Sequence, residues 1–313
     1  MEKVIIDNVE LILSHPLKKT GDWIGQQEPQ RQLLACWLTV DANDLPLTPR
    51  ITGYPGVGKT TLAIATAKQR NQDIYIMQCT SDTRPEDLII SPVLSEKGNI
   101  SYHASPLLSA VIKGGIVILD EGDRMSEKSW ASLAALFDNR RTVESIIAGI
   151  TVNAHKEFRA AVTMNEDSST FEIPDYIMSR LQPCIEVGFP TRDDEMAILS
   201  YNIPFCEEET LDLCVGFLQR SHHLDLPFSI RDGINAIRYT LKRRKADPDA
   251  QTKDLFEMAI RQILGKDALD LDSLVEKRKA TGEYYNDGNL PGMNLGDFFF
   301  PDNDQLNPDN PED

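Results

Sequence analysis

The segment from Gly53 to Thr60 constrains the fold of this chain more than any other. It runs Gly-Tyr-Pro-Gly-Val-Gly-Lys-Thr and matches the pattern G-x-x-x-x-G-K-[ST] at every fixed position. Its glycines let the backbone curl so that successive N–H groups point inward, and a helix beginning near Lys59 adds the positive end of its dipole. The segment therefore predicts a phosphate-binding loop. Its predicted contact residues are Gly53, Pro55, Gly56, Val57, Gly58, Lys59, Thr60 and Thr61.

The residues on either side favour this prediction over a glycine-rich structural turn. Residues 49–52 predict a short strand, and residues 61–67 are good helix formers with apolar residues at helical spacing. Strand, loop and helix thus follow in the order that the pattern requires. In such a site Lys59 reaches the β- and γ-phosphates of a nucleoside triphosphate, and the Thr60 hydroxyl ligates Mg²⁺.

A second stretch places two carboxylates at the end of an apolar strand. Ile116 to Leu119 are four consecutive aliphatic residues, and Asp120 and Glu121 follow them. This pattern predicts a buried central strand of a parallel sheet, and such sheets bind ligands at the carboxyl ends of their strands. A bare carboxylate there is costly. We therefore expect Asp120 to hold Mg²⁺ through water and Glu121 to polarise the water that attacks the γ-phosphate.

Two further segments have both a functional and a structural interpretation. The predicted strand 158–165 ends at Asn165, which either forms a turn or orients the lytic water. Ile24 and Gly25 precede an amphipathic helix over residues 28–38, and this pair either contacts the nucleotide base or only packs. The adjacent His222 and His223 are poorly placed to share a metal, so we expect a capping or surface role.

Changes in periodicity along the chain predict its organisation. Residues 1–21 suggest a mobile or partner-dependent lead-in, residues 22–189 an α/β nucleotide-binding domain, and residues 190–280 a small all-α domain. Residues 281–313 are acidic, rich in Asp, Asn, Gly and Pro, and predict a disordered tail. Phe298-Phe299-Phe300 in this tail either dock on a partner or a neighbouring subunit, or pack on the helical domain.

Composition limits the setting and the partners. The sequence has no run of 18 apolar residues and no basic leader followed by an apolar stretch, so we expect neither a membrane span nor secretion. The 5 cysteines are scattered without metal-ligand spacing, as in proteins whose thiols stay reduced, which favours a cytoplasmic setting. A net charge of −17 disfavours nucleic-acid binding by the whole surface, but it does not exclude a local basic channel.

Taken together, these motifs resemble those of the AAA+ ATPases. The resemblance rests on the phosphate-binding loop, the Asp120-Glu121 pair, Asn165, Arg180 and Arg231. Predicted hairpins over residues 92–103 and 142–152 are similar to the insertions of the helix-2-insert branch. The segment Ser105 to Ala110, ahead of Leu119-Asp120-Glu121, is similar to the MoxR group and its dynein-related relatives. The resemblance extends over residues 22–265.

This resemblance implies a fold and a set of roles. The fold is α/β, a P-loop NTPase parallel sheet sandwiched by helices, followed by a small all-α lid domain. ATP and Mg²⁺ are the implied cofactors, and Asn165 is the implied sensor that positions water. Arg180 lies where the family places the arginine finger that completes a neighbouring subunit's site, and Arg231 where the lid contacts the γ-phosphate in cis. A homo-oligomeric ring, expected to be a hexamer, follows.

The implied function is ATP hydrolysis that remodels or activates a partner protein, and by likeness that partner carries a von Willebrand factor A domain. The chain departs from the family's sequence motif at Gly122-Asp123-Arg124, which matches only part of the motif that follows the acidic pair. The alternatives are a nucleic-acid motor or the NTPase subunit of a defence nuclease complex, and a nucleotide switch that does not hydrolyse. The intact Glu121 disfavours the switch.

Overall fold

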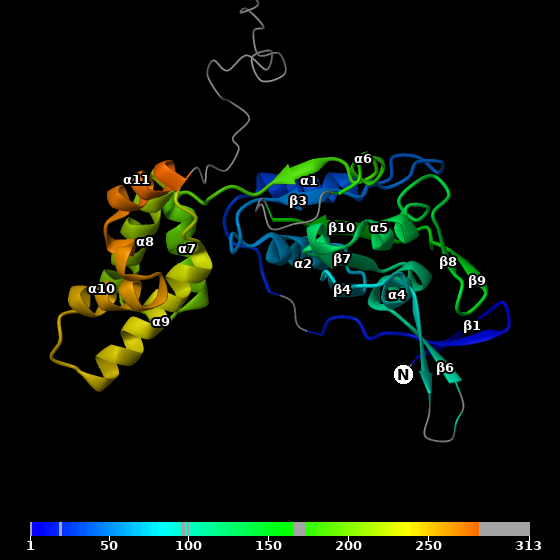
Figure 1. The fold of residues 1–313 in the computed structure, drawn as a ribbon, viewed down its shortest axis with the longest axis horizontal. Coiled ribbons are helices and arrows are strands. Elements are labelled where there is room, and N and C mark those ends of the chain that lie inside the picture. The colour runs from blue at the N-terminus through cyan, green and yellow to red at the C-terminus, as the bar shows by residue number, and fades with distance from the viewer. Residues whose placement is uncertain (1, 19–20, 95–97, 99, 166–172, 282–313) are drawn as a thin grey trace, which may run out of the picture.

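A computed structural model describes residues 2–18, 21–94, 98, 100–165 and 173–281 of the chain. Along its long axis the molecule has two parts, a sheet with its helices at one end and a group of helices at the other (Figure 1). The predicted tail, with Phe298 to Phe300, lies outside the described residues except for Thr281, which ends the last helix. Within the described residues, no helix is both long and apolar enough to cross a bilayer.

The central sheet is parallel and has the strand order β11-β3-β10-β7-β4. Aliphatic residues alternate between its two faces, because successive side chains of a strand point in opposite directions. Ile116 and Ile118 belong to one buried cluster, whereas Val117 and Leu119 belong to another. The strands are β3 (Arg50–Thr52), β4 (Ile74–Gln78), β7 (Ile116–Asp120), β10 (Arg159–Thr163) and β11 (Cys184–Glu186).

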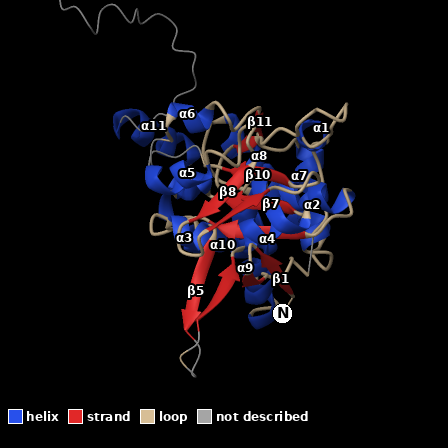
Figure 2. Cartoon of the chain, turned by 90° about the vertical axis from the view of Figure 1, so that its right-hand side faces the viewer, coloured by secondary structure: helices blue, strands red, loops and turns tan. Residues whose placement is uncertain are grey.

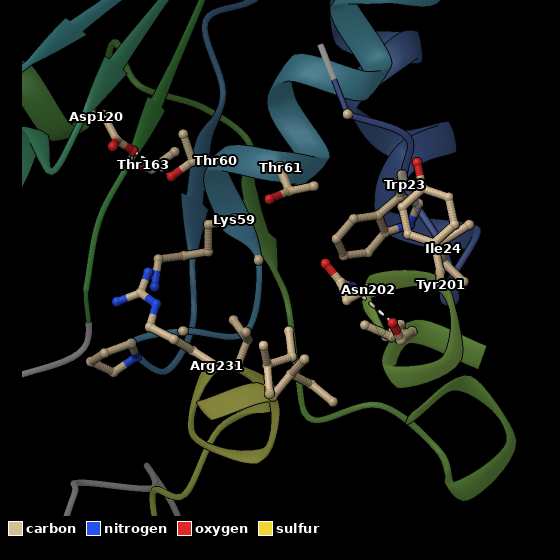
Figure 3. A pocket seen from close by; sticks show the side chains of 18 of the residues that line it. Trp23, Ile24, Lys59, Thr60, Thr61, Asp120, Thr163, Tyr201, Asn202 and Arg231 are labelled. Carbon is tan, nitrogen blue, oxygen red and sulfur yellow. Dashed lines mark hydrogen bonds between the residues drawn. The ribbon is translucent and has the colours of Figure 1, made fainter. Parts of the chain in front are cut away.

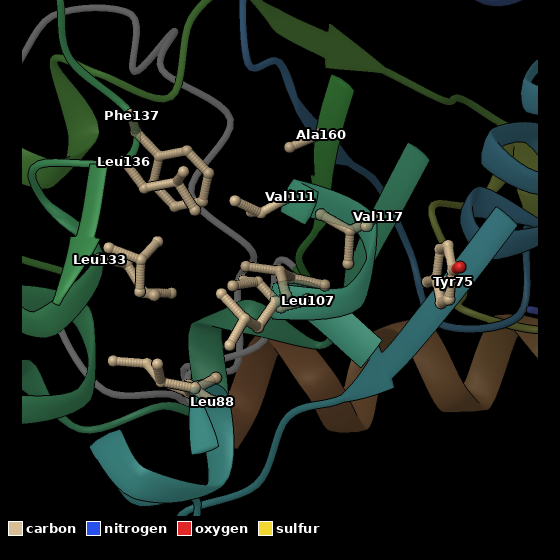
Figure 4. Packing of buried hydrophobic residues seen from close by; sticks show 14 of the residues in the cluster. Tyr75, Leu88, Leu107, Val111, Val117, Leu133, Leu136, Phe137 and Ala160 are labelled. Carbon is tan, nitrogen blue, oxygen red and sulfur yellow. The ribbon is translucent and has the colours of Figure 1, made fainter. Parts of the chain in front are cut away.

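Helices cover both faces of this sheet. On one face Leu33 and Trp37, at the end of α1, and Leu62 of α2 are fully buried; on the other, Leu107 of α4 and Leu133 of α5 pack into the cluster of Figure 4. Burial of each such side chain contributes about 1.5–3 kcal/mol. These helices are α1 (Glu28–Cys36), α2 (Lys59–Gln69), α4 (Pro106–Lys113) and α5 (Glu127–Leu133), and the short helices are α3 (Pro85–Leu88), η1 (Gly122–Arg124) and α6 (Asp175–Met178). The predicted sandwich of a parallel sheet between helices is therefore present.

The first residues of the chain differ from the expected mobile lead-in. Lys3 to Ile12 form an antiparallel hairpin, and its second strand pairs in parallel with a strand of the hairpin that follows α3. Leu11 is fully buried and anchors this pairing. The resulting sheet has the order β1-β2-β6-β5, with β1 (Lys3–Ile6), β2 (Val9–Ile12), β5 (Ile90–Leu94) and β6 (Ile100–Ala104). Figure 2 shows β5 and its partner extending away from the helices.

The second predicted hairpin is also present, as β8 (Thr142–Ser145) paired with β9 (Ile150–Asn153). After β11 the chain enters a group of helices, called the lid below. It has its own hydrophobic core, in which Leu199, Val215 and Ile237 are fully buried. The lid contains α7 (Arg192–Asn202), α8 (Glu208–His223), α9 (Ile230–Ala246), α10 (Thr252–Ile263), η2 (Lys266–Leu269) and α11 (Leu271–Thr281). The sequence had not predicted α11.

Candidate functional site

The loop of residues 53–60, called the glycine loop below, connects β3 to α2 at the carboxyl end of the sheet. Gly53, Gly56 and Gly58 have φ values of 140°, 84° and 104°, which residues with a side chain rarely adopt. The helix begins at Lys59, and the ammonium of Lys59 donates to the carbonyl oxygens of Gly53 at 2.7 Å and Tyr54 at 2.9 Å. The loop therefore curls around its own lysine at the start of a helix.

Asp120 lies next to this loop and accepts two hydroxyl hydrogen bonds. Thr60 Oγ1 donates to Asp120 Oδ1 at 2.6 Å, and Thr163 Oγ1 donates to the same oxygen at 2.6 Å. Thr163 arrives there because β10 pairs with β7 in a register that sets Val162 opposite Leu119. Sequence reasoning had assigned Thr60 and Asp120 together but had missed Thr163. These hydroxyl and carboxylate oxygens are the hard donors that Mg²⁺ prefers.

Glu121 is held in an unusual backbone conformation directly after β7. Its φ is 56°, and its N–H donates to Thr163 Oγ1 at 3.0 Å. A residue with a Cβ in this region costs about 1–2 kcal/mol, and such strain clusters at functional sites. The Glu121 carboxylate is 2.8 Å from Arg124 Nε. Arg124 thus lies beside the predicted catalytic carboxylate, a contact that the sequence had not predicted.

The glycine loop, the two acids and the lid enclose one pocket of about 730 Å³. Lys59, Thr60, Asp120 and Thr163 lie at one end, and Trp23, Ile24, Tyr201 and Asn202 gather at the other, with Arg231 reaching toward Lys59 from the lid (Figure 3). The predicted site residues that line this pocket are Ile24, Pro55, Gly56, Val57, Gly58, Lys59, Thr60, Thr61, Asp120, Glu121, Asn165 and Arg231.

Three predicted site residues do not line the pocket. Gly53 contributes its carbonyl to Lys59, and Gly25 forms a turn with a φ of 103° that packs against Asp194 of the lid. Arg180 follows α6, where its guanidinium donates to Asp138 Oδ2 at 3.4 Å and to the carbonyl oxygen of Tyr176. Of the two residues predicted to contact the nucleotide base, Ile24 lines the pocket and Gly25 does not.

The aromatic end of the pocket includes residues that the sequence had not indicated. Trp23 packs close to Gly58, since a Cβ added at Gly58 would meet its ring at 3.1 Å. The indole N–H of Trp23 donates to the carbonyl oxygen of Gln26 at 2.6 Å, so this N–H is already paired within the protein. Tyr201 of the lid donates to Asp22 at 3.3 Å. These contacts join the segment before α1 to the lid across the pocket.

Two carboxylates near the site have altered acidity. Asp22 lies 2.7 Å from Lys68, and this hydrogen bond and charge, together with Tyr201, lower the pKa of Asp22. The pKa of Asp138 is held well below its usual range, first by its hydrogen bonds to Arg140 and further by Arg180. Both carboxylates therefore stay ionised at neutral pH, and Asp138 keeps a negative charge beside Arg180.

Comparison with known proteins now identifies the domain. Residues 51–181 match the family model described as an AAA domain of the dynein-related subfamily. This confirms the resemblance predicted from the motifs, and the AAA domain contains the glycine loop, both acids, Asn165 and Arg180.

The chain spans about half, or less, of the length of the curated relatives that it matches. YeaC of Bacillus subtilis (strain 168), an uncharacterized protein, is 29% identical over 175 residues, which cover 53% of this chain and 52% of YeaC. The denitrification regulatory protein NirQ of Pseudomonas aeruginosa is 28% identical over 37% of this chain and 44% of NirQ. The von Willebrand factor A domain-containing protein 8 of Mus musculus is 24% identical over 61% of this chain and 11% of that protein.

Solved structures share the fold. The RuvB Holliday junction branch migration motor of Thermotoga maritima superposes with a TM-score of 0.52 at 16% identity, covering 76% of this chain and 69% of RuvB. NtrX from Brucella abortus in complex with ADP superposes with a TM-score of 0.54 at 16% identity, covering 83% of this chain and 63% of NtrX. These matches confirm the predicted AAA+ fold.

Proposed function

We propose that this protein is a Mg²⁺-dependent ATPase. The observation that supports this most is the single pocket in which Lys59, Thr60, Asp120 and Glu121 of the AAA domain face Arg231 of the lid. A glycine-rich loop with one lysine at a helix start suits the phosphates of a nucleotide, and a carboxylate beside it suits activation of water. The likeness to NtrX, solved with ADP and with ATP, is consistent with a bound adenine nucleotide.

Each residue has a role in this proposal. Lys59 binds the β- and γ-phosphates, and Thr60 and Asp120 hold Mg²⁺, which neutralises charge developing on the phosphoryl oxygens. Glu121 takes a proton from the attacking water, and Asn165 orients that water. Arg231 approaches from the lid and stabilises the negative charge of the γ-phosphate.

A second arginine connects hydrolysis to assembly in this proposal. Arg180 lies outside its own chain's pocket, where Asp138 and Tyr176 hold its guanidinium, and this position supports the proposal that it acts on another subunit's nucleotide. We expect a homo-oligomeric ring, in keeping with the MoxR-like resemblance, and a hexamer as its stoichiometry. Because such an Arg acts in trans, turnover would depend on protein concentration.

The proposed consequence of hydrolysis is the remodelling of a partner protein. Similarity to the mouse von Willebrand factor A domain-containing protein 8 favours a partner carrying that domain. Similarity to a subunit of the Holliday junction branch migration complex, RuvB of Pseudothermotoga lettingae (31% identical over 34% of this chain), keeps a nucleic-acid motor as the alternative. The net charge of −17 makes the protein partner the better-supported candidate.

The activity is tested with two variants that affect different steps. Lys59→Ala should abolish nucleotide binding, since it removes the charge at the phosphates, whereas Glu121→Gln should bind ATP normally and release no phosphate. Lys128→Ala and Glu127→Gln are matched controls, because these exposed residues lie outside the pocket. Equal loss of binding in Lys59→Ala and Glu121→Gln would overturn the assignment of roles.

The partner is tested by affinity capture with the Glu121→Gln protein held in ATP. Co-purification of a protein with a von Willebrand factor A domain, lost on exchange into ADP, would support remodelling of that class of partner. Recovery of nucleic acid, together with stimulation of phosphate release by DNA or RNA, would instead support the motor.

A further inference from the structure

A buried histidine in the lid makes contacts that the site described above does not use. The His222 side chain on α8 is 7% exposed, and its Nδ1 lies 3.1 Å from Oε1 of Glu195 on α7, which is 0% exposed. Its Nε2 lies 2.7 Å from the carbonyl oxygen of Phe228. The neighbouring His223 is exposed, with Nδ1 2.6 Å from the Gln219 carbonyl oxygen. The expected capping or surface role therefore does not describe His222.

The chemistry of these contacts fixes the orientation of the imidazole ring. A carbonyl oxygen can only accept, so His222 Nε2 donates to Phe228. On the other side of the ring, Nδ1 is in close contact with the Glu195 carboxyl group at 3.1 Å. The Glu195 side chain is 0% exposed, so this polar contact lies inside the lid. Glu195 thus holds the ring with Nε2 directed at Phe228.

The ring of His222 also ends an aromatic stack that starts in the glycine loop. Tyr54 of that loop stacks on Phe189 with ring centroids 4.6 Å apart at 14°. Phe189 stacks in turn on His222 at 3.8 Å and 11°. Phe189 lies between β11 and the lid, and its carbonyl oxygen accepts a hydrogen bond from Gln26 at 3.0 Å. The stack connects the glycine loop, the connecting segment and the lid.

The carbonyl group that His222 holds lies at the start of the helix that carries Arg231. Phe228 precedes Ser229, the N-cap of α9, and Arg231 is in the first turn of that helix. Ser229 and Asp232 close this end as a capping box. Ser229 also touches the glycine loop, since a Cβ added at Gly56 would lie 2.4 Å from Ser229 Oγ. A shift of Phe228 would therefore move Arg231 relative to the glycine loop.

We propose that His222, oriented by Glu195 and stacked on Phe189, is a positioning residue that sets the place of Arg231 relative to the glycine loop. This inference rests on the proposed ATPase function, in which Arg231 contacts the γ-phosphate. His222 touches no reacting group and acts through the Phe228 carbonyl. Changes in the glycine loop on nucleotide binding pass through Tyr54 and Phe189 to the same ring. His222 thus couples the nucleotide-bound state of the glycine loop to the position of Arg231.

The test compares His222→Phe, which keeps the stack but loses the donor, with His222→Gln, whose amide can still donate to Phe228. We expect His222→Phe to lower kcat about tenfold, as for loss of one oriented hydrogen bond, with the Kd for ADP within about twofold of wild type. His222→Gln should recover part of kcat, and His223→Phe, the matched control, should leave it unchanged. Phe189→Leu should reproduce the fall in kcat because it breaks the stack. If His222→Phe does not fold, Phe189→Leu is used in its place.

A double-variant cycle separates positioning from a structural role. If His222 acts through Arg231, adding His222→Phe to Arg231→Ala should cause almost no further loss of kcat. Additive losses, or a His222→Phe protein as active as His223→Phe, would overturn the inference while leaving the ATPase function intact. If wild type releases no phosphate, the proposed function fails instead. The inference is then judged by hydrogen exchange, where ATP should protect the amides of residues 230–233 in wild type but not in His222→Phe.

Discussion

Replacing Gly56 with alanine should separate the lid from the glycine loop without unfolding the protein. Gly56 has a φ of 84°, and a Cβ there would lie 2.4 Å from Oγ and 2.8 Å from Cβ of Ser229, at the start of α9. The positive φ costs about 1–2 kcal/mol for a residue with a Cβ. The clash adds about 1–3 kcal/mol, as overpacking does in other cores. Because Ser229 belongs to the lid, an outward movement of the lid relieves the clash but not the strain of the positive φ.

The relieved part sets the expected effect on hydrolysis. A closed arrangement disfavoured by about 1–3 kcal/mol is about 5- to 150-fold less populated, at roughly 1.4 kcal/mol per factor of ten. Single-turnover hydrolysis should fall by that factor if Arg231 acts only from the closed lid. The remaining strain of about 1–2 kcal/mol should lower the melting temperature by only about 2–8 °C.

Gly53→Ala is the matched control in the same loop. Its φ is 140°, and its Cβ would lie 2.3 Å from the carbonyl oxygen of Val187, whose N–H donates to Thr52 at 2.9 Å. This backbone is paired to β3 and does not move with the lid. We expect the two costs to add to a loss of about 2–5 kcal/mol, or roughly 4–20 °C in Tm. Equal losses of Tm in the two variants, or wild-type hydrolysis by Gly56→Ala, would refute the lid-contact argument.

Three other predictions concern separate contacts. Arg124→Ala should raise the steady-state rate of basal ATP hydrolysis about two- to fivefold. The reason is that Glu121 no longer has to break its ion pair with Arg124, which contributes under about 1 kcal/mol because both side chains are partly exposed. A slower rate would contradict this prediction. Mixing Arg180→Ala with Glu121→Gln subunits should restore part of the turnover if Arg180 acts in trans, and no recovery at any ratio would count against a shared site. Burial raises the pKa of the Cys79 thiol to about 12, whereas Cys184 is exposed, so at pH 8 a thiol reagent should modify Cys184 at least tenfold faster, as peptide mass mapping can measure. Comparable rates would place Cys79 outside the buried core.

The parts of the site that sequence alone could predict are those encoded within a few neighbouring residues. The glycine loop needs only its own glycines and the helix that follows, and Asp120 only the aliphatic run before it. Thr163 could not be predicted, because its contact with Asp120 depends on the register between β10 and β7. Sequence spacing carries no information about that register.

The other features that the sequence did not predict depend on contacts between distant segments of the chain. The β2–β6 pairing joins two short strands far apart in the chain, and the apolar residues from Val9 to Leu13 did not indicate which strand they would pair with. His222 looked like a surface residue because its partners Glu195 and Phe189 come from other segments. Predicting either would have required the packing of elements, which hydrophobic periodicity alone does not determine.

The β1–β2 hairpin has a consequence for how assembly of this protein is measured. It covers one edge of β6, and the other edge of β6 is paired with β5, whose Leu94 is 70% exposed. A shortened chain that begins after the hairpin would leave the backbone of β6 unpaired on this edge at Tyr102 and His103. Such an edge favours pairing with another molecule. A nucleotide-independent oligomer of that shortened chain would therefore report strand addition at β6 and not a ring.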